Sequence, residues 1–423
     1  MSLDVAAYDA VLKESYEGTI RDILNSRTKT LELFTKDSDS WEGRHVRYPL
    51  NVGRNEGVMY TSENGHLPDA GNQVTTEVQV PMRYMHGRIQ LSIQVMKHSA
   101  TSKGAFKRAM DQEMSGLIRD ISNERNRVMF GYGKGVLGLV SGDPGTGTTF
   151  NMKDPGGVAG TVSPARWVRK NMNVAFMTAG GTIHGTARLI TARDATVTTL
   201  TCAAMDAAVL ADDIVVRAAK TSTSAVGNTA YDKEAMGLLG LIDDGTYLVT
   251  LHNVSRTTYP QFKSPVLSAV GPLSADIIQR GIDLADQSGE GVTEKFVCHH
   301  SVRRAYLALM EADRRYTMES LKKPDAGTVA AKERDVTYGD VPWIVDKDCH
   351  FGMLFGVDRS YNTHYVECEG EWADDDGTIL LRLVDTDAYE ARYRIFENFM
   401  NERPAASFRL DGITANAVTV AIE

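Results

Sequence analysis

The chain has 423 residues, of which 42% are hydrophobic and 24% are charged, and its formal net charge is −9. This length and composition are typical of a globular protein with two or three domains, and they exclude a disordered or fibrous chain. The acidic balance argues against a protein that reads nucleic-acid sequence, which would present a basic face, although a container for nucleic acid remains compatible with it.

Neither a signal peptide nor a membrane span is expected. The first residues have no basic region followed by an apolar one, and no apolar run approaches the ~18 residues that a span needs. The cysteines are few and far apart, which favours reduced thiols in a cytosol over a disulfide framework. They are Cys202, Cys298, Cys349 and Cys368.

The N-terminal third of the chain predicts an arm and a long helix. An apolar stripe at helical spacing in the first 24 residues, followed by the polar run TKDSDSWEG, favours an N-terminal arm. Residues 43–98 are turn-rich and then alternate in polarity over 74–80 and again over 89–95, as half-buried strands require. We therefore predict a long two-stranded arm.

Directly after this arm, apolar residues at helical spacing predict one helix over 103–130, about 42 Å long at ~1.5 Å per residue. Ser99, Thr101 and Ser102 offer N-caps, and Gly131 and Gly133 end the helix. A compact enzyme rarely needs so long a polar arm before its first core helix, whereas an assembling shell protein does.

The sequence pattern changes at residue 159 and again at residue 236. After a Gly/Thr-rich connection at 131–150, residues 159–220 carry short β segments, which predict a small β-barrel or sandwich inserted between helix-bearing segments. From residue 236 the pattern is mixed, with one helix capped near Ser274 and closed by Gly289 and another capped by Ser301. The expected strands are 173–177, 182–192, 196–202, 214–218, 247–251, 295–298, 341–345, 352–355, 379–384, 388–399 and a β-leaning tail at 406–422.

No motif for cofactor binding or catalysis is convincing. Gly133-Lys-Gly135-Val-Leu-Gly138 matches the dinucleotide pattern by letter, but it follows a helix and opens none, so we interpret it as a flexible hinge. The sequence contains no P-loop, zinc-protease or serine-hydrolase motif.

Three clusters could hold a ligand, and each has a plainer interpretation. Cys298-His299-His300 and Cys349-His350 could converge on zinc, but their spacing is not that of a closed structural site, and buried thiols explain them better. The run Asp374–Asp376 with Asp385 and Asp387 could hold Mg²⁺ or Ca²⁺, although an Asp-Gly turn between two strands explains the run as well.

The third cluster, Arg314-Arg315-Tyr316, could clamp a carboxylate at a subunit vertex or simply end a solvated helix. We therefore predict no catalytic, cofactor-binding or metal-binding residues and no cofactor.

In order and spacing, these segments resemble the major capsid proteins of tailed bacteriophages, the Hong Kong phage (HK-ninety-seven-type) fold that encapsulins also use. Phrases such as GTYLVTLHN, ADRRY and DTDAYEARY carry the resemblance together. It implies an α+β fold in which the parts follow a fixed order. These are an N-terminal arm (1–42), an extended loop (43–98), a spine helix with the peripheral domain (99–158), an inserted β-barrel-like domain (159–230), an axial domain (231–373), and return strands of the peripheral domain with a C-terminal tail (374–423).

The resemblance further implies a non-enzymatic subunit that forms hexamers and pentamers and closes an icosahedral shell around double-stranded DNA. It places the chain in a virion capsid assembled in the host cytoplasm, with a portal protein, a separate scaffolding protein and room for a decoration protein. Some members join a loop lysine to a neighbour's asparagine. Here no lysine occurs between Lys36 and Lys97, so we expect a shell without that cross-link.

Two alternatives stay open at this point. An encapsulin-like compartment would keep the fold but enclose a protein cargo instead of DNA. A metal-dependent hydrolase would use Cys298, His300, Cys349 and the Asp374–Asp376 run, and it would require stoichiometric metal.

Overall fold

The computed structural model describes residues 29–38, 45–93, 103–160, 162–221, 223–314, 336–374, 377–383 and 387–415. Within these ranges, no helix is long and apolar enough to cross a membrane. The apolar stripe of the first 24 residues and the end of the β-leaning tail lie outside them. The described chain mixes helices with several sheets, which confirms the α+β fold class.

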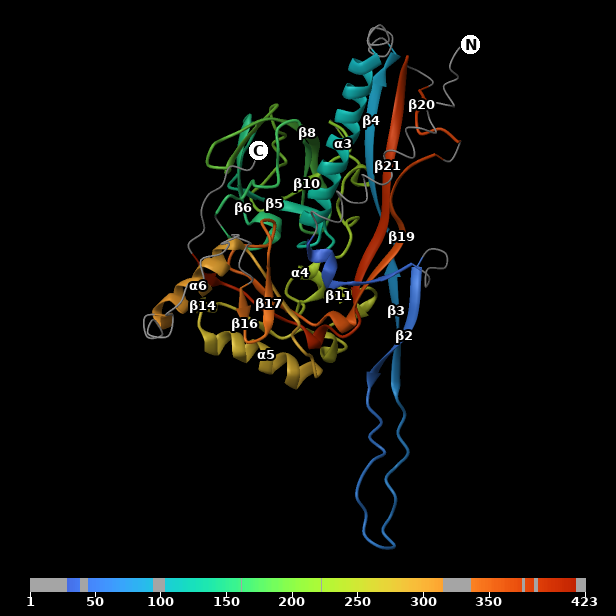
Figure 1. Cartoon of the computed structure of the whole chain (residues 1–423), viewed down its shortest axis with the longest axis vertical. Helices are drawn as coiled ribbons and strands as arrows, with labels where there is room; N and C mark the ends of the chain where they lie inside the picture. The colour runs from blue at the N-terminus through green and yellow to red at the C-terminus, as the bar shows by residue number, and fades with distance from the viewer. Residues whose placement is uncertain are drawn as a thin grey trace, which may run out of the picture.

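A long helix and a long sheet lie side by side in the upper part of the molecule (Figure 1). Helix α3 (Lys103–Val128), which we call the spine helix, agrees with the helix predicted from the sequence. Its Ile118 and Ile121 pack with Ile89 of the sheet in one buried cluster. The strands of this sheet are β1 (Thr35–Asp37), β4 (Arg83–Ser92), β19 (Asn362–Trp372), β20 (Leu381–Arg382) and β21 (Ala388–Asn401).

Strands β2 (His45–Gly53) and β3 (Val74–Pro81) form an antiparallel arm that projects from the body (Figure 1). Only Met82 separates β3 from β4, so the arm and the long sheet share one nearly continuous strand. The two alternating stretches of the sequence therefore lie end to end, and β2 supplies the second strand of the arm. Residues 54–73, which we call the tip, join β2 to β3 without strand structure.

A closed barrel stands beside the spine helix (Figure 1). Its interior is filled by apolar side chains that include Phe150, Phe176, Ile190 and Leu200. The order around the barrel is β10-β5-β6-β9-β8-β7. The strands are β5 (Val136–Ser141), β6 (Thr149–Lys153), β7 (Asn173–Met177), β8 (Ile183–Arg193), β9 (Thr199–Cys202) and β10 (Ile214–Arg217).

The barrel begins earlier than the range 159–230 expected for it. Strands β5 and β6 come from the Gly/Thr-rich stretch that the sequence suggested was only a connection. Strand β5 pairs with β10 on one side and β6 on the other, and β6 continues the ring to β9. Closure removes free strand edges, and it needs these two strands to complete the ring.

A second sheet with two helices lies below the barrel in Figure 1. Helix α5 (Ala275–Gly289) and helix α6 (His300–Arg314) belong to it, and Ile278, Phe296 and Val302 share its buried cluster. The strand order is β13 (Val266–Leu267), β22 (Phe408–Leu410), β18 (Leu354–Val357), β15 (Lys295–Cys298), β17 (Val341–Val345) and β16 (Thr337–Tyr338).

The caps of these helices agree with the sequence in one case and differ in the other. Ser274 caps α5, where its hydroxyl oxygen accepts a hydrogen bond from the Ile277 N–H at 3.3 Å. Helix α6 starts one residue before the expected cap Ser301. There the ring Nδ1 of His299 accepts a hydrogen bond from the Ser301 N–H at 3.1 Å, so the N-cap of α6 is His299 and not Ser301.

The remaining elements are short. The strand expected over 247–251 is reduced to two residues, and so is the strand expected over 379–384. The 3-10 helices are η1 (Lys29–Leu33), η2 (Pro155–Gly157), η3 (Val226–Asn228), η4 (Pro260–Phe262), η5 (Arg359–Tyr361) and η6 (Pro404–Ala406). The short α-helix is α4 (Leu238–Leu241), and the two-residue strands are β11 (Thr250–Leu251), β12 (Val254–Ser255), β14 (Gly271–Pro272) and β23 (Ile413–Thr414).

The barrel joins the rest of the chain at a narrow stem. The chain enters the stem at Lys134 and leaves it at Asp232, where the Asp232 N–H donates to the Lys134 carbonyl at 3.2 Å. The Lys134 ammonium also lies 3.4 Å from the Asp232 carboxylate. Inside the stem, the Ala230 N–H donates to the Arg217 carbonyl at 2.8 Å. The two ends of the barrel segment are therefore neighbours.

Candidate assembly interface

The tip of the arm exposes apolar side chains. Val58 is 74% exposed, Met59 60%, Tyr60 103% and Leu67 85%. Burial of such groups is the main favourable term in protein association, and a cluster of them on a projecting loop indicates a surface that another molecule covers.

Asn55 makes one hydrogen bond across the tip and a second within its own side of the tip. Asn55 donates from Nδ2 to the Gly71 carbonyl at 2.9 Å, and its Oδ1 accepts the Gly57 N–H at 2.8 Å. A Cβ atom on Gly71 would lie 2.3 Å from Asn55 Oδ1, so a larger residue there would displace the Asn55 side chain from these hydrogen bonds. The tip therefore has a defined shape although it packs on little else.

The root of the arm is anchored in the main core. Val78 and Val80 of β3 are buried in the same cluster as Phe399 of β21. The Gln79 N–H donates to the His252 carbonyl at 3.2 Å, and the His252 Nε2–H donates to the Phe399 carbonyl at 2.9 Å. Burial lowers the pKa of His252 to about 4, so this histidine is neutral at pH 7. A rigid root and an unpacked tip are what an arm that reaches a neighbour requires.

A buried ion network joins the spine helix to the long sheet. The Arg125 Nε–H donates to Glu397 Oε1 at 2.7 Å, and the His364 Nε2–H donates to Glu397 Oε2 at 2.7 Å. The His364 ring also stacks on Phe399, with the ring centroids 4.4 Å apart. Burial alone would raise the pKa of Glu397, but Arg125 and His364 outweigh it and hold the pKa at about 2. Nothing local in the sequence predicted this network.

The two Cys-His groups lie in buried structure. Cys298 and Cys349 are buried free thiols, and burial raises the pKa of Cys298 to about 12 and that of Cys349 well above its usual value. Zinc binds cysteine as the deprotonated thiolate, whereas these buried environments favour the neutral thiol. Across the described ranges, no three His, Cys, Asp or Glu side chains are grouped as metal ligands.

The other candidates are scattered. Gly133 and Gly135 have positive φ angles of 81° and 73° and lead into β5, and a Cβ on Gly135 would lie 2.5 Å from the Ala230 carbonyl oxygen. These glycines therefore serve close packing at the barrel stem. Arg314 ends α6, while Asp375, Asp376, Asp385, Arg315 and Tyr316 lie outside the described residues.

Comparison with solved structures identifies the fold, whereas the sequence matches no protein-family model and no curated protein. The capsid asymmetric unit of cyanophage A-1(L) matches with a TM-score of 0.53 and 11% identity, over 92% of this chain and 93% of that chain.

Two other structures match at 8% identity with TM-scores of 0.43. The capsid of a native GTA particle covers 92% of this chain and 91% of its own, and Mycobacterium phage Bobi covers 92% and 90%. The fold assignment rests on the first structure, the one of the three with a TM-score above 0.5. This chain has the fold of a bacteriophage capsid protein.

Proposed function

We propose that this chain is the major capsid protein of a tailed bacteriophage, a non-enzymatic subunit that forms hexamers and pentamers of an icosahedral shell around double-stranded DNA. The observation that carries the proposal is the arm, whose root is locked into the core while its tip exposes Val58, Met59, Tyr60 and Leu67. The likeness of the whole fold to a cyanophage capsid subunit supports it. In this proposal the tip covers apolar surface on an adjacent subunit. Apolar side chains that would lower the solubility of a monomer are then buried in an interface.

The proposal includes the way in which the shell is held together. The arm contains no lysine between Lys36 and Lys97, so it supplies no amine for an isopeptide bond. Contacts between subunits are then non-covalent, with a separate scaffolding protein, a portal protein and room for a decoration protein. Assembly takes place in the host cytoplasm and the product is the virion capsid. We retain the division into arm, extended loop, peripheral, inserted and axial domains as part of this proposal, with β5 and β6 added to the inserted domain.

Electron microscopy and light scattering of the purified chain, expressed with and without its scaffolding protein, test this proposal. We expect closed uniform shells, or hexamers and pentamers that close when scaffold is added. Tyr60→Ser/Leu67→Ser removes apolar surface from the tip, and we expect it to leave soluble, folded subunits that do not close into shells. The matched control Leu210→Ser/Val226→Ser changes exposed apolar residues of the barrel region instead, and shells should still form.

A chain that stays monomeric or dimeric under all these conditions would overturn the proposal. Closed shells that form without the scaffolding protein and enclose a different protein in place of DNA would identify the encapsulin-like alternative. Stoichiometric metal, together with hydrolytic activity that chelation abolishes, would be needed for the hydrolase alternative.

A further inference from the structure

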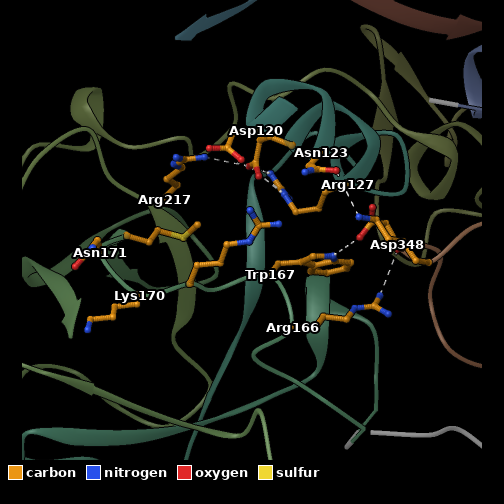
Figure 2. Close-up of a pocket in the computed structure, with 13 residues that line it drawn as sticks. Asp120, Asn123, Arg127, Arg166, Trp167, Lys170, Asn171, Arg217 and Asp348 are labelled. Atoms are coloured by element: carbon orange, nitrogen blue, oxygen red, sulfur yellow. Dashed lines mark hydrogen bonds and ion pairs between the residues drawn. The ribbon is translucent and has the colours of Figure 1, made fainter. Parts of the chain in front are cut away.

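A pocket of ≈ 170 Å³ lies where the spine helix, the barrel and the loop after β17 meet (Figure 2). The end of α3 supplies one wall, which includes Asn123, Glu124 and Arg127. Residues 166–172, just before β7, supply the floor, and Arg217 at the end of β10 supplies another wall. Lys347 and Asp348 close the remaining side.

The pocket is strongly basic although the chain is acidic. Among the described residues that line it, six are cationic and three are carboxylates. The carboxylates Glu124 and Asp348 are already engaged, the first by Arg127 at 2.8 Å and the second by Asn126 at 2.7 Å. The cationic residues are Arg127, Arg166, Arg169, Lys170, Arg217 and Lys347.

Three of these cations have no carboxylate partner within ion-pair distance in the described part of the chain. The half-buried Arg169 and the exposed Lys170 make no side-chain hydrogen bond there, and Lys347 reaches only the Asn123 side-chain oxygen, at 3.4 Å. Figure 2 shows Lys170 and Arg217 at the edge of the pocket that faces away from Asp348. Like charges that line one pocket repel one another, so the site favours an anion between them.

A buried guanidinium adds to this excess. Arg166 is 3% exposed, lies 4.1 Å over the Trp167 ring, and has an Nε atom without a hydrogen-bond partner among the described residues. Its terminal nitrogens donate only to carbonyl oxygens, those of Cys349 at 3.3 Å and Asp348 at 3.4 Å. Burial lowers the pKa of Arg166 to about 10, which still leaves it charged at pH 7. Within the described chain Arg166 therefore makes no direct ion pair, and the nearby Asp348 and Asp346 carboxylates only partly offset the burial of its charge.

We propose that this pocket binds a phosphate group. Its lining is mainly charged and polar, so an apolar ligand would find few partners, and planar guanidinium forks match the oxygens of a phosphate in two-point hydrogen bonds. At ≈ 170 Å³ the pocket has room for several waters or one phosphate. The phosphate is either a free ion or a group of a nucleic-acid backbone, and both present the same oxygens. Phosphate binding here does not depend on the proposed shell function.

Isothermal titration of the purified full chain with inorganic phosphate, at ionic strength held constant with chloride, tests the site. We expect saturable binding that is about tenfold weaker in Arg169→Gln/Lys170→Gln, because two charge-assisted contacts are lost. Lys347→Gln removes one exposed charge and should weaken binding in the same direction. The control Lys263→Gln/Arg359→Gln neutralises two cations outside the pocket and should bind phosphate as the unmodified chain does.

A parallel titration with short double-stranded DNA, followed by fluorescence anisotropy, distinguishes the two sources. Loss of DNA affinity in the pocket variants but not in the control assigns the site to backbone phosphate, whereas unchanged DNA affinity assigns it to a free ion. Absence of saturable phosphate binding, or equal affinity in the pocket variants and the control, would overturn the proposal. Either result leaves shell assembly by the arm to be judged on its own test.

Discussion

At the residue scale, His350 ties the end of the spine helix to the loop after β17. Its Nε2–H donates to the Phe130 carbonyl at 2.9 Å, while its Nδ1 has no partner among the described residues. The side chain is 1% exposed, and burial together with the nearby Arg166 lowers its pKa from 6.5 to about 3. A proton added at Nδ1 would therefore be buried without an acceptor.

Acid should destabilise the fold through this histidine. The unfolded state binds the proton near pH 6.5 and the folded state only near pH 3. Stability is therefore complete above pH 6.5 and falls as the pH falls through that window. We expect His350 alone to account for a loss on the order of 2 kcal/mol between pH 7 and pH 5. Urea unfolding curves of His350→Gln, whose amide keeps a donor but does not titrate, should show a shallower loss over this range.

The matched control for this measurement is His66→Gln, which changes an exposed histidine at the tip. Its stability should depend on pH as that of the unmodified chain does. If His350→Gln and the unmodified chain lost stability equally between pH 7 and pH 5, the buried neutral state of His350 would be wrong.

The two helix N-caps show which contacts the local sequence predicts and which it does not. Ser274 was recognisable as a cap because its hydroxyl acts within one turn of its own helix. His299 replaced Ser301 as the cap of α6 because its ring is half-buried against Phe351, with the ring centroids 4.4 Å apart, and that contact comes from a distant part of the chain. The Arg125–Glu397 ion pair was not predicted for the same reason, because its two residues are far apart along the chain.

At the element scale, the end of the spine helix is closed by other elements instead of water. The Leu238 N–H donates to the Met129 carbonyl at 2.7 Å, and the Gly240 N–H donates to the Gly131 carbonyl at 3.3 Å. Carbonyls at a helix end have no partner within the helix, so these bonds fix where α4 meets the end of the spine helix. Gly237 makes this contact possible, because a Cβ there would lie 2.3 Å from the Val128 carbonyl oxygen.

Gly237→Ala should therefore destabilise the fold. All of the nearest atoms are backbone oxygens, at 2.3, 2.6 and 2.7 Å, so relief requires a shift of the helix end or of α4, at a cost of about 1–3 kcal/mol or more. The control Gly116→Ala lies within the spine helix with nothing within 4 Å of its Cβ, and it should stabilise by about 0.5–1 kcal/mol. Thermal unfolding measures both. Equal melting temperatures for the two variants would contradict the close contact at Gly237.

Element prediction succeeded where the signal was local. The spine helix and β7 follow from side-chain periodicity within their own segments, and the structure has them at nearly the expected bounds. Strands β5 and β6 were missed because the stretch is rich in Gly and Thr, and their strand state depends on ring closure with β10 and β9. Pairing partners far along the chain leave no trace in local periodicity.

At the scale of the whole molecule, the composition of the arm makes a prediction about the particle. With no lysine between Lys36 and Lys97, the arm supplies no amine for an isopeptide bond to a neighbouring subunit. We expect particles seen as closed by electron microscopy to dissociate in boiling detergent into a single band at 46.4 kDa. A ladder of covalent dimers and larger species from the same particles would contradict a shell held by non-covalent contacts.

The order of segments along the chain predicted the fold of the whole molecule better than it predicted the sites. Arm, long helix and mixed sheets follow one another as expected, because each has its own pattern in sequence. The basic pocket was not predicted, since it brings together Glu124, Arg169, Arg217 and Lys347 from four separate segments. An overall charge of −9 conceals such a local excess.

The narrow stem of the barrel makes that domain a side branch of the chain. Lys134 and Asp232 are hydrogen-bonded neighbours, and no barrel strand pairs with a strand outside the ring in the described ranges. The path of the backbone through the two large sheets is thus complete without the barrel. A longer, shorter or different closed module at this stem would break no strand pairing outside the ring. Such an exchange would remove the walls that the barrel gives to the basic pocket.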